Sequence, residues 1–310
     1  MEQRILGKTG FEVSALGFGG GPVGFLATDR QQVAEILNPL LDQGVNLIDT
    51  AAGYFGSEEA IGEAVGHRRD DYVLVSKCGQ AFKDIDGEAW SAQAIGQTID
   101  RSLERLKTDH IDVMLLHSCD LETLKEGEAL GSLIAARGAG KVRFIGYSGD
   151  NEAAVYAAGL DDVAVIETSV NICDQANVDA ALPEAQRNNV GVLAKRPIAN
   201  AAWKDASEQQ GIYIDYARTY SERLAKMGIT PADLGFSGTV GEAWSEIALR
   251  FTLSMPGLTT AIVGTTRPSN IKCNLEIAAK GILPEKIVVE LRSAFRSAEN
   301  DAAEPWLAQT

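Results

Sequence analysis

The residues Ile111-Asp112-Val113-Met114-Leu115-Leu116-His117 form a short apolar run that ends on a histidine. Two earlier runs have the same form: Val45-Asn46-Leu47-Ile48 is followed by Asp49, and Val73-Leu74-Val75-Ser76 is followed by Lys77. Continuous apolar runs of this length are typical of parallel strands that are buried on both faces. A polar residue at the carboxyl end of each strand would lie at one common edge of such a sheet.

Outward from these three runs, the chain alternates between short apolar segments and longer segments with helical spacing. This alternation predicts eight strands, at Ser14–Gly17, Val45–Asp49, Tyr72–Lys77, Ile111–His117, Phe144–Ser148, Val163–Thr168, Gly191–Lys195 and Thr260–Val263. Eight βα units favour a closed parallel barrel over an open doubly wound sheet. We therefore predict an α/β protein of the (β/α)8 TIM-barrel class, with residues 1–310 forming a single domain.

Helical spacing of apolar residues predicts the connecting helices. Asp29 and Ser91 are the expected N-caps of two of them, and Ser57 opens a third that ends near Gly66. Later helices are expected at Leu130–Ala139, Glu152–Gly159, Val178–Asn188, Glu242–Ser254 and Ser269–Ala279.

Three segments lie outside the βα repeat. The Gly7-Lys8-Thr9-Gly10 turn predicts an N-terminal hairpin that closes the bottom of the barrel. The long segment Asn200–Thr239 follows the seventh strand and contains a predicted helix at Tyr213–Met227, so it is expected to be an insertion on the catalytic side. Glu285–Ser297 predicts an extra C-terminal helix beyond the barrel.

The composition excludes several classes of partner. The chain has a formal net charge of −15, which repels nucleic-acid phosphates and anionic lipid surfaces. No apolar stretch reaches the roughly 18 residues of a membrane span, and the N-terminus lacks the pattern of a secretion signal. The four cysteines and three histidines share no disulfide or metal-binding spacing. We therefore expect a cytoplasmic protein with reduced thiols, no metal site, and neither a nucleic-acid nor a membrane partner.

Four side chains from one early part of the chain can converge at the predicted barrel rim. Neighbouring strands lie about 4.8 Å apart, so Asp49, Lys77 and His117 on consecutive strands can reach one pocket. Tyr54 follows Asp49 in a glycine-flanked loop that can fold back over the strand ends. Each residue alone could equally be a helix cap, a rim ion pair or a packing residue. Together they favour a shared site.

An Asp, a Lys, a Tyr and a His in one pocket can form a proton relay. A tyrosine has an ordinary pKa of about 10, and a nearby ammonium lowers it by stabilising the phenolate. A carboxylate keeps that ammonium charged, and a histidine can orient a substrate oxygen. Such a relay suits hydride transfer, in which a carbonyl oxygen gains a proton as its carbon gains a hydride. We therefore expect Lys77 to lower the pKa of Tyr54.

Over nearly its whole length the chain resembles the aldo-keto reductases. The matching pieces are Asp49-Thr50-Ala51 through Tyr54-Phe55-Gly56-Ser57-Glu58, Val75-Ser76-Lys77, Ser102-Leu103-Glu104-Arg105-Leu106, Ile111–His117, Ile145-Gly146-Tyr147-Ser148 and Ile262-Val263-Gly264-Thr265-Thr266-Arg267. The resemblance implies a monomeric NAD(P)H-dependent oxidoreductase that interconverts a small carbonyl compound (an aldehyde, aldose or ketone) and its alcohol. It implies Tyr54 as the general acid/base, Lys77 and Asp49 as the groups that tune it, and His117 as the residue that orients the carbonyl.

The resemblance also implies a nicotinamide cofactor that lies extended across the barrel mouth. Gly20 and Gly21 match a loop whose backbone touches the cofactor, and Asp49, at the end of the next predicted strand, is a further expected cofactor contact. Ser148 matches the residue that hydrogen-bonds the nicotinamide carboxamide. Glu167 stands where the family commonly has Gln. A carboxylate can accept from the amide NH2 but cannot donate to the amide carbonyl unless it is protonated.

Further predicted cofactor contacts supply positive charge. Lys195-Arg196-Pro197 stands where many relatives have an aromatic residue and Ser-Pro, and the Arg196 guanidinium could stack on the nicotinamide or bind the diphosphate. The match to the family's adenosine site covers Gly264, Thr265, Arg267, Asn270 and Asn274. Thr265 and Arg267 at a helix start suit a 2′-phosphate. NADP(H) is therefore preferred, and NAD(H) stays possible because Gly264 and Asn270 replace basic residues of some relatives.

The substrate and the direction of the reaction are less defined than the cofactor. The aromatic candidates for lining the pocket are Phe25, Phe55, Phe82 and Trp203. Two other functions stay open. Lys77 could form a Schiff base in an aldolase, although this requires a neutral amine and Asp49 favours the ammonium. The barrel could also bind a cofactor as a regulatory protein without turnover.

Overall fold

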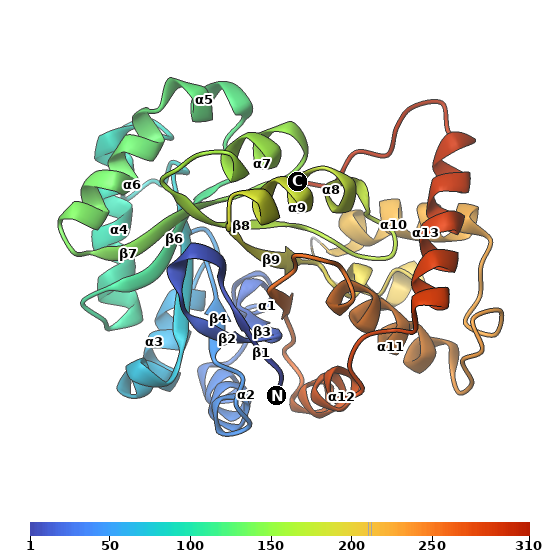
Figure 1. Cartoon of the computed structure of the whole chain (residues 1–310). Helices are drawn as coiled ribbons and strands as arrows, with labels where there is room; N and C mark the ends of the chain where they lie inside the picture. Colours follow the sequence, from blue (N-terminus) through green and yellow to red (C-terminus); the bar gives the residue numbers. More distant parts are fainter. Residues whose placement is uncertain (210, 212) are drawn as a thin grey trace.

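Eight parallel strands close into a barrel (Figure 1), which confirms the predicted (β/α)8 class. The structure is a computed structural model and describes residues 1–209, 211 and 213–310. Around the barrel the strands follow the order β10-β3-β4-β5-β6-β7-β8-β9. Their bounds are β3 Leu16–Gly19, β4 Leu47–Asp49, β5 Val73–Cys78, β6 Ile111–His117, β7 Val142–Ser148, β8 Val163–Ser169, β9 Gly191–Lys195 and β10 Thr260–Val263.

The register of the parallel ladder aligns the polar strand ends. His117 pairs directly with Ser148, and Ser148 pairs with Glu167. Lys77 pairs with Leu115, which is two positions before His117. Asp49 pairs with Val75, which is two positions before Lys77. Residues an even number of positions apart on a strand project to the same side. These five side chains therefore project into the barrel at one rim.

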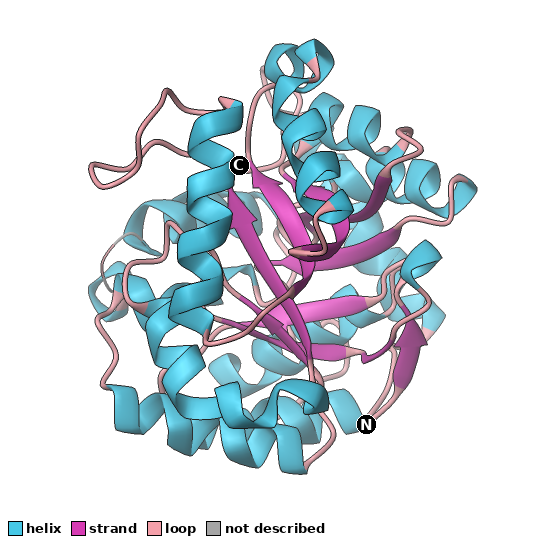
Figure 2. Ribbon diagram, turned by 90° about the vertical axis from the view of Figure 1, so that its left-hand side faces the viewer, coloured by secondary structure: helices cyan, strands magenta, loops and turns pink. Residues whose placement is uncertain are grey.

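Helices surround the barrel on the outside (Figure 2). The longer ones of the βα repeat are α2 Arg30–Asp42, α3 Ser57–Val65, α4 Ala92–Leu106, α6 Glu128–Gly138, α7 Asn151–Ala158, α9 Ala181–Arg187, α11 Val240–Leu253 and α12 Pro268–Ala279. The shorter ones are η1 Gly7–Thr9, α1 Gly21–Phe25, η2 Gly66–Asp71, α5 Leu121–Glu126, α8 Ala176–Asp179, η3 Ala199–Ala201 and η4 Ala206–Glu208. Asp29 and Ser91 cap α2 and α4 with their side chains, as predicted.

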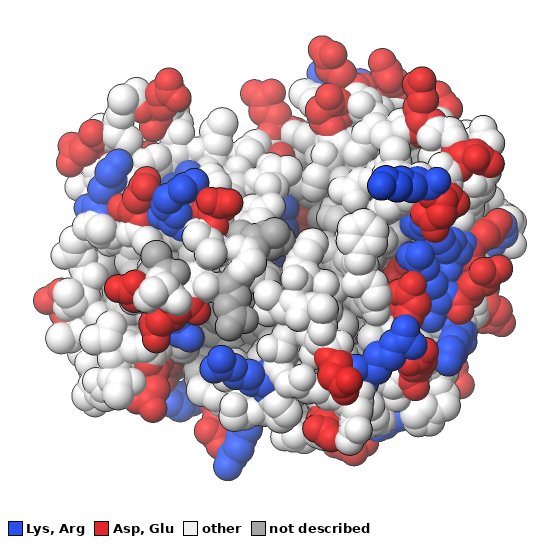
Figure 3. Space-filling model, turned by 180° about the vertical axis from the view of Figure 1, so that it is seen from behind, with Lys and Arg blue, Asp and Glu red and all other residues white. Residues whose placement is uncertain are grey.

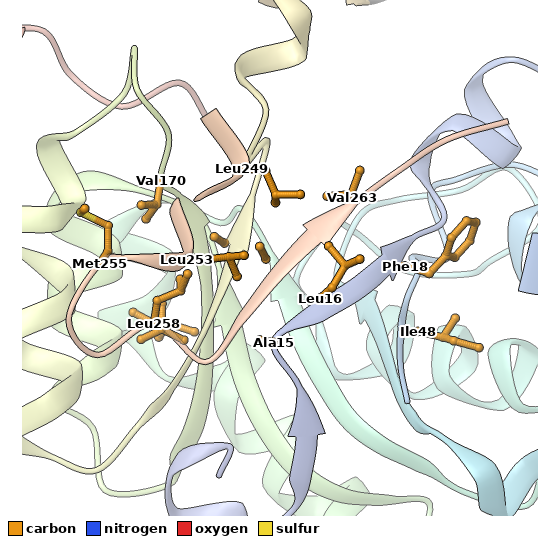
Figure 4. Close-up of a cluster of buried hydrophobic side chains, with 14 of the residues drawn as sticks. Ala15, Leu16, Phe18, Ile48, Val170, Leu249, Leu253, Met255, Leu258 and Val263 are labelled. Atoms are coloured by element: carbon orange, nitrogen blue, oxygen red, sulfur yellow. The ribbon is translucent and has the colours of Figure 1, made fainter. Parts of the chain in front are cut away.

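Two layers of apolar side chains form the core. The inner layer fills the barrel and includes Leu47, Val75, Val113, Leu115 and Leu193. The outer layer lies between strands and helices. Figure 4 shows the part of it that includes Leu249 and Leu253 of α11 together with Leu16 of β3 and Val263 of β10. Strands buried on both faces explain the continuous apolar runs in the sequence.

A hairpin closes the bottom of the barrel, as predicted. Strands β1 (Gln3–Ile5) and β2 (Glu12–Ser14) pair antiparallel, and Leu6 between them is fully buried in the inner layer. Gly7 has a φ of +49°, and a Cβ there would lie 2.2 Å from the Gly191 backbone nitrogen. Only glycine permits this approach of the hairpin to β9.

Some element boundaries differ from the predictions. The first barrel strand begins at Leu16 rather than Ser14, because Ser14 belongs to β2 and its hydroxyl donates to the Leu16 carbonyl at 2.6 Å. The predicted helix Val178–Asn188 is two helices, α8 and α9, because the backbone at Ala180 (φ −117°, ψ −71°) interrupts it. Helices α1 and α5 were not predicted because five or six residues are too few to show a helical period.

The C-terminal third extends beyond the barrel. Helix α10 spans Tyr213–Met227, as predicted, and α13 spans Glu285–Asn300, ending later than the predicted Ser297. Figure 1 shows α10, α11 and α13 grouped on one side of the barrel. Beyond α13 the chain turns back, and Trp306 packs edge-on against Phe295 of α13 with ring centroids 5.1 Å apart.

The surface carries an excess of acidic groups. Figure 3 shows Asp and Glu intermixed with Lys and Arg over the face seen from behind. Within the described residues, no helix combines the length and the apolar composition that a membrane crossing requires.

Candidate active site

A buried ammonium lies at the centre of the predicted constellation. Lys77 is fully buried at the end of β5, and its Nζ is 2.5 Å from Asp49 Oδ1 on β4. The same Nζ donates to the Thr50 carbonyl oxygen at 3.0 Å. Glu167 Oε2, on β8, lies 3.2 Å from it. Two carboxylates therefore face one ammonium, and the sequence predicted only the pair with Asp49.

The two carboxylates keep Lys77 charged. Burial acts to lower the pKa of Lys77, but Asp49 and Glu167 outweigh it and raise this pKa above its ordinary value. The pKa of Asp49 is raised as well, first by burial and then by Glu167, although Lys77 acts to lower it. A Schiff base forms only on a neutral amine. The environment of Lys77 therefore opposes the aldolase alternative.

The loop between β4 and α3 holds Tyr54 over the barrel rim. The Tyr54 carbonyl accepts from the Ser57 backbone N–H at 2.9 Å. Its backbone lies against Gly24, where a Cβ would be 2.7 Å from the Tyr54 carbonyl carbon. The Tyr54 ring is edge-on to the His117 ring with centroids 5.6 Å apart, and Lys77 Nζ is 5.1 Å from the Tyr54 ring centroid. The predicted relay residues are therefore neighbours.

The pKa of Tyr54 is raised to about 12, so the prediction of a lowered pKa was wrong. Burial is the largest cause. Lys77 acts in the predicted direction, but Asp49 and Glu167 add to the effect of burial. The prediction weighed the ammonium and omitted the cost of burying a phenolate. Tyr54 is consequently a phenol near neutral pH, which is the form that can donate a proton.

His117 ends β6 as a neutral imidazole. Its pKa is lowered to about 3, first by burial and then by Lys77 and Lys195. Its Nδ1 is buried and has no hydrogen-bond partner among the described residues. A neutral imidazole has one N–H donor and one acceptor nitrogen. His117 can therefore bind a substrate oxygen but does not carry an extra proton near neutral pH.

Asp49, Tyr54 and His117 open onto a cleft of about 670 Å³ at the barrel mouth. That size is typical of small-molecule sites. The predicted site residues that line it are Gly21, Asp49, Tyr54, His117, Ser148, Glu167, Lys195, Arg196, Pro197, Gly264, Thr265, Arg267 and Asn270. Lys77, Gly20 and Asn274 are not among the described lining residues. Lys77 lies beneath the cleft, and Gly20 packs so closely on the Tyr54 loop that a Cβ would be 2.6 Å from Ser57 Oγ.

An acidic residue that the sequence analysis missed holds Lys195 at the end of β9. Lys195 Nζ lies 2.7 Å from Asp150 Oδ2, and the Asp150 side chain is fully buried. Asp150 Oδ1 accepts from Thr168 Oγ1 at 3.0 Å and from the Ser169 backbone N–H at 2.7 Å. Asp150 follows the polar end of β7 by two positions, a signal that resembles the strand-end pattern of Asp49 and Lys77.

Arg196 is fixed between the insertion and the C-terminal segment. Its Nη1 donates to Ser169 Oγ at 3.0 Å and to the Gln309 carbonyl oxygen. Its guanidinium carbon lies over the Tyr216 ring, 4.3 Å from the centroid. One face of the Arg196 plane is therefore occupied by an aromatic ring of the protein.

The predicted adenosine contacts lie where the chain enters α12. The Arg267 backbone N–H and the Asn270 side-chain amide each donate to Thr265 Oγ1 at 3.1 Å. Arg267 and Asn270 are exposed along the cleft. This end of the cleft can therefore present a cation and amide groups to an anionic ligand.

Aromatic side chains line the cleft in a different set from the one predicted. Phe25 lines it, with its ring centroid 5.1 Å from that of Tyr54. Tyr213 and Tyr216 of the insertion also line it. Their spacing of three residues on a predicted helix was the available signal for a shared face. The other three candidates, Phe55, Phe82 and Trp203, are not among the described lining residues and instead contact other aromatic rings.

Comparison with known proteins identifies the family. A model of the aldo/keto reductase family matches residues 15–294. L-galactose dehydrogenase from Arabidopsis thaliana is 27% identical over 290 residues, which cover 89% of this chain and 87% of that protein. NADH-specific methylglyoxal reductase from Escherichia coli is 28% identical over 225 residues, which cover 64% of this chain and 68% of that protein.

A solved structure supports the fold independently. The holo form of an aldo-keto reductase from Bacillus halodurans superposes with a TM-score of 0.78, covers 95% of this chain and 96% of its own, and is 24% identical. The chain belongs to the aldo/keto reductase family and is an oxidoreductase of the kind that reduces carbonyl compounds with a nicotinamide cofactor.

Proposed function

We propose that this chain reduces a small aldehyde, aldose or ketone with NADP(H), and that Tyr54 is its general acid. The observation that carries the proposal is the meeting of three groups beside the cleft. Lys77 Nζ is 5.1 Å from the Tyr54 ring centroid, and the Tyr54 and His117 ring centroids are 5.6 Å apart.

The relay residues divide the proton transfer between them. Tyr54 Oη gives its proton to the carbonyl oxygen as the carbonyl carbon receives a hydride, which a bound nicotinamide supplies. The Lys77 ammonium stabilises the phenolate that this leaves, and Asp49 holds the ammonium in place. The neutral His117 donates a hydrogen bond to the carbonyl oxygen and orients it. In the reverse reaction the Tyr54 phenolate takes the proton of the alcohol.

The donors and acceptors along the cleft fit a nicotinamide dinucleotide. Ser148 can donate to the carboxamide carbonyl, and Glu167 can accept from the carboxamide NH2. Lys195 and Arg196 can face the diphosphate, and Arg196 does so more readily than it stacks on the nicotinamide, because Tyr216 occupies one of its faces. The remaining proposed contacts are Gly20, Gly21, Asp49, Pro197, Gly264, Thr265, Arg267, Asn270 and Asn274.

The preference for NADP(H) depends on Arg267 beside Thr265. Replacing Arg267 by Ala should weaken NADPH binding by about 10-fold or more, because a charge-assisted contact contributes roughly 1.5–3 kcal/mol. The affinity for NADH should change little. Lys272→Ala is the matched control, since Lys272 is an exposed cation on the same helix. Equal losses for both cofactors in a fluorescence titration would remove the 2′-phosphate role.

The function is tested by following nicotinamide absorbance. NADPH and NADH are each offered with aldehydes, aldoses and ketones, and the oxidised cofactors with the matching alcohols. We expect turnover of at least one small carbonyl compound, with NADPH the better donor. Cofactor binding without turnover of any compound would contradict the proposal and favour a regulatory role.

We further infer a single-domain monomer that works in the cytoplasm. Cys78, Cys119, Cys173 and Cys273 are all free, and all but Cys273 are buried. Unpaired thiols are typical of proteins in a reducing compartment. Sedimentation of the purified protein as one species of about 33 kDa would support the monomer.

A further inference from the structure

We propose that Glu167 is a positioning residue of the proton relay: as a second counter-ion of Lys77, it opposes ionisation of Tyr54. This inference rests on the proposed role of Tyr54 and extends it. The Glu167 side chain is 3% exposed, and its Oε2 lies 3.2 Å from Lys77 Nζ. Lys77 has one positive charge and is already paired with Asp49 at 2.5 Å. When both carboxylates are ionised, Glu167 therefore adds a buried negative charge that the single ammonium does not balance.

Among the described residues, the groups around Glu167 give it no ion pair besides the one with Lys77. On β4 and β5 it faces Asp49 and Lys77. On β6 and β7 the neighbouring strand ends are His117, which is neutral, and the uncharged Ser148. On β9 the cation is Lys195; Glu167 acts to raise its pKa, but its Nζ is paired at 2.7 Å with Asp150.

Glu167 Oε2 is buried, and the Lys77 ammonium at 3.2 Å is the cation that it contacts among the described residues. The Lys77–Asp49–Glu167 cluster, when all three groups are ionised, consequently has an excess negative charge directly beside the Tyr54 ring.

This excess negative charge makes loss of the Tyr54 phenol proton less favourable. A phenolate on Tyr54 would be a further anion next to Asp49 and Glu167. Burial is the largest cause of the raised pKa of Tyr54, and Lys77, the next largest, acts to lower it. Asp49 and then Glu167 act to raise it, and Arg196 acts to lower it. A glutamine at this position would have nearly the same size and would leave Asp49 and Lys77 as a balanced pair. Glu167 therefore keeps Tyr54 in its proton-donating form to higher pH and moves the alkaline limit of carbonyl reduction upward.

The test is the pH dependence of kcat/KM for carbonyl reduction in Glu167→Gln. We expect the alkaline pKa of the profile to fall by about one pH unit. That is the order of magnitude for removing a unit charge several ångströms from the phenol at an effective dielectric constant of about 20. Glu58→Gln is the matched control. Glu58 is also a buried glutamate, but it hydrogen-bonds Ser76 instead of Lys77, so the alkaline pKa should stay at the wild-type value.

A purely structural role would give a different result. If Glu167 served only packing or cofactor contact, Glu167→Gln would lower kcat/KM by the same factor at every pH and leave the alkaline pKa unmoved. That outcome would overturn the proposal.

A second measurement does not need turnover. The tyrosinate absorbance of each protein is titrated with alkali and compared with that of its own Tyr54→Phe partner, so that the difference reports Tyr54 alone. We expect ionisation of Tyr54 to begin at lower pH in Glu167→Gln than in the wild type. Identical difference titrations would overturn the role of Glu167. Absence of turnover in the wild type, with a shifted titration, would instead overturn the proposed function and leave the charge effect standing.

Discussion

His117 and Tyr54 are both neutral at the centre of a site that contains several charges. Burial is the largest cause in each case: it penalises the imidazolium of His117 and the phenolate of Tyr54. Lys77 then acts on the two rings in opposite ways, since an ammonium disfavours a second cation and favours an anion. The result is a hydrogen-bond donor and a proton donor side by side, both in the form that carbonyl reduction requires.

The neutral His117 predicts a specific acid sensitivity of the fold. Its pKa is about 3 in the folded protein and about 6.5 when unfolded, so between these values the unfolded state binds the extra proton. The contribution to stability is therefore present above pH 6.5 and is lost as the pH falls towards 3, by up to about 1.4 kcal/mol per pH unit. The free energy of unfolding should depend less steeply on pH in His117→Gln than in the wild type.

Chemical denaturation at a series of pH values between 6 and 4 measures this slope. His67→Gln, which changes an exposed histidine, should keep the wild-type slope. Equal slopes for the wild type and His117→Gln would show that the buried imidazole does not resist protonation.

The sequence predicted which side chains meet but not their ionisation. Asp49, Lys77 and His117 could be found because each ends an apolar run, and consecutive parallel strands must be neighbours. The pairing of Glu167 with Lys77 could not be found in this way, because β8 is three strands away from β5 along the chain and approaches it only across the barrel. Because the prediction took account of neither Glu167 nor the burial of the phenol, it gave the wrong direction for the pKa shift of Tyr54.

At the scale of elements, Asp150 joins the carboxyl ends of three neighbouring strands. Following β7, it binds Thr168 and Ser169 on β8 and Lys195 on β9. Side-chain contacts between strand ends fix the loops that form the cleft. Such contacts leave no periodic pattern, which is why strands and long helices were predicted from the sequence while this network was not.

Removing the charge of Asp150 should destabilise the protein strongly. Asp150→Asn leaves the Lys195 ammonium buried without its partner, and breaking a buried pair in this way costs about 3–5 kcal/mol. Asp179→Asn is the matched control, because Asp179 pairs with Arg292 and Arg296 at the surface, where a pair contributes about 1 kcal/mol at most. If urea unfolding shows the same loss of unfolding free energy in Asp150→Asn and Asp179→Asn, the strand-end network contributes no more to stability than a surface ion pair.

At the scale of the whole molecule, the end of the described chain is part of the site. Ala308 and Asn151 exchange two hydrogen bonds, at 2.9 and 3.1 Å. Arg223 of α10 donates to the Leu307 carbonyl at 2.7 Å, and the Gln309 carbonyl accepts from Ser169 and Arg196. Residues that are far apart in sequence therefore hold Arg196 in place together. No local pattern in the sequence indicates contacts of this length.

Trp306 holds the C-terminal segment in place, and its removal should lower both the stability of the fold and the affinity of the site for NADPH. Trp306→Ala should cost about 3–5 kcal/mol of unfolding free energy, since a large buried ring leaves a cavity against Phe295. It should also weaken NADPH binding, because Arg196 loses its support. Leu307→Ala, which changes a neighbouring side chain that is 63% exposed, should alter both quantities little. An unchanged NADPH affinity in Trp306→Ala would show that the C-terminal segment does not support the cofactor site.

The relay itself is tested most directly by replacing Tyr54 with Phe and measuring turnover and cofactor affinity together. General acid catalysis contributes about 10²–10⁴-fold, so kcat should fall by at least about 100-fold while the NADPH affinity stays close to wild type. Tyr72→Phe is the control, because Tyr72 is also buried but precedes the opposite end of β5. Wild-type turnover in Tyr54→Phe would contradict the assignment of Tyr54 as the proton donor.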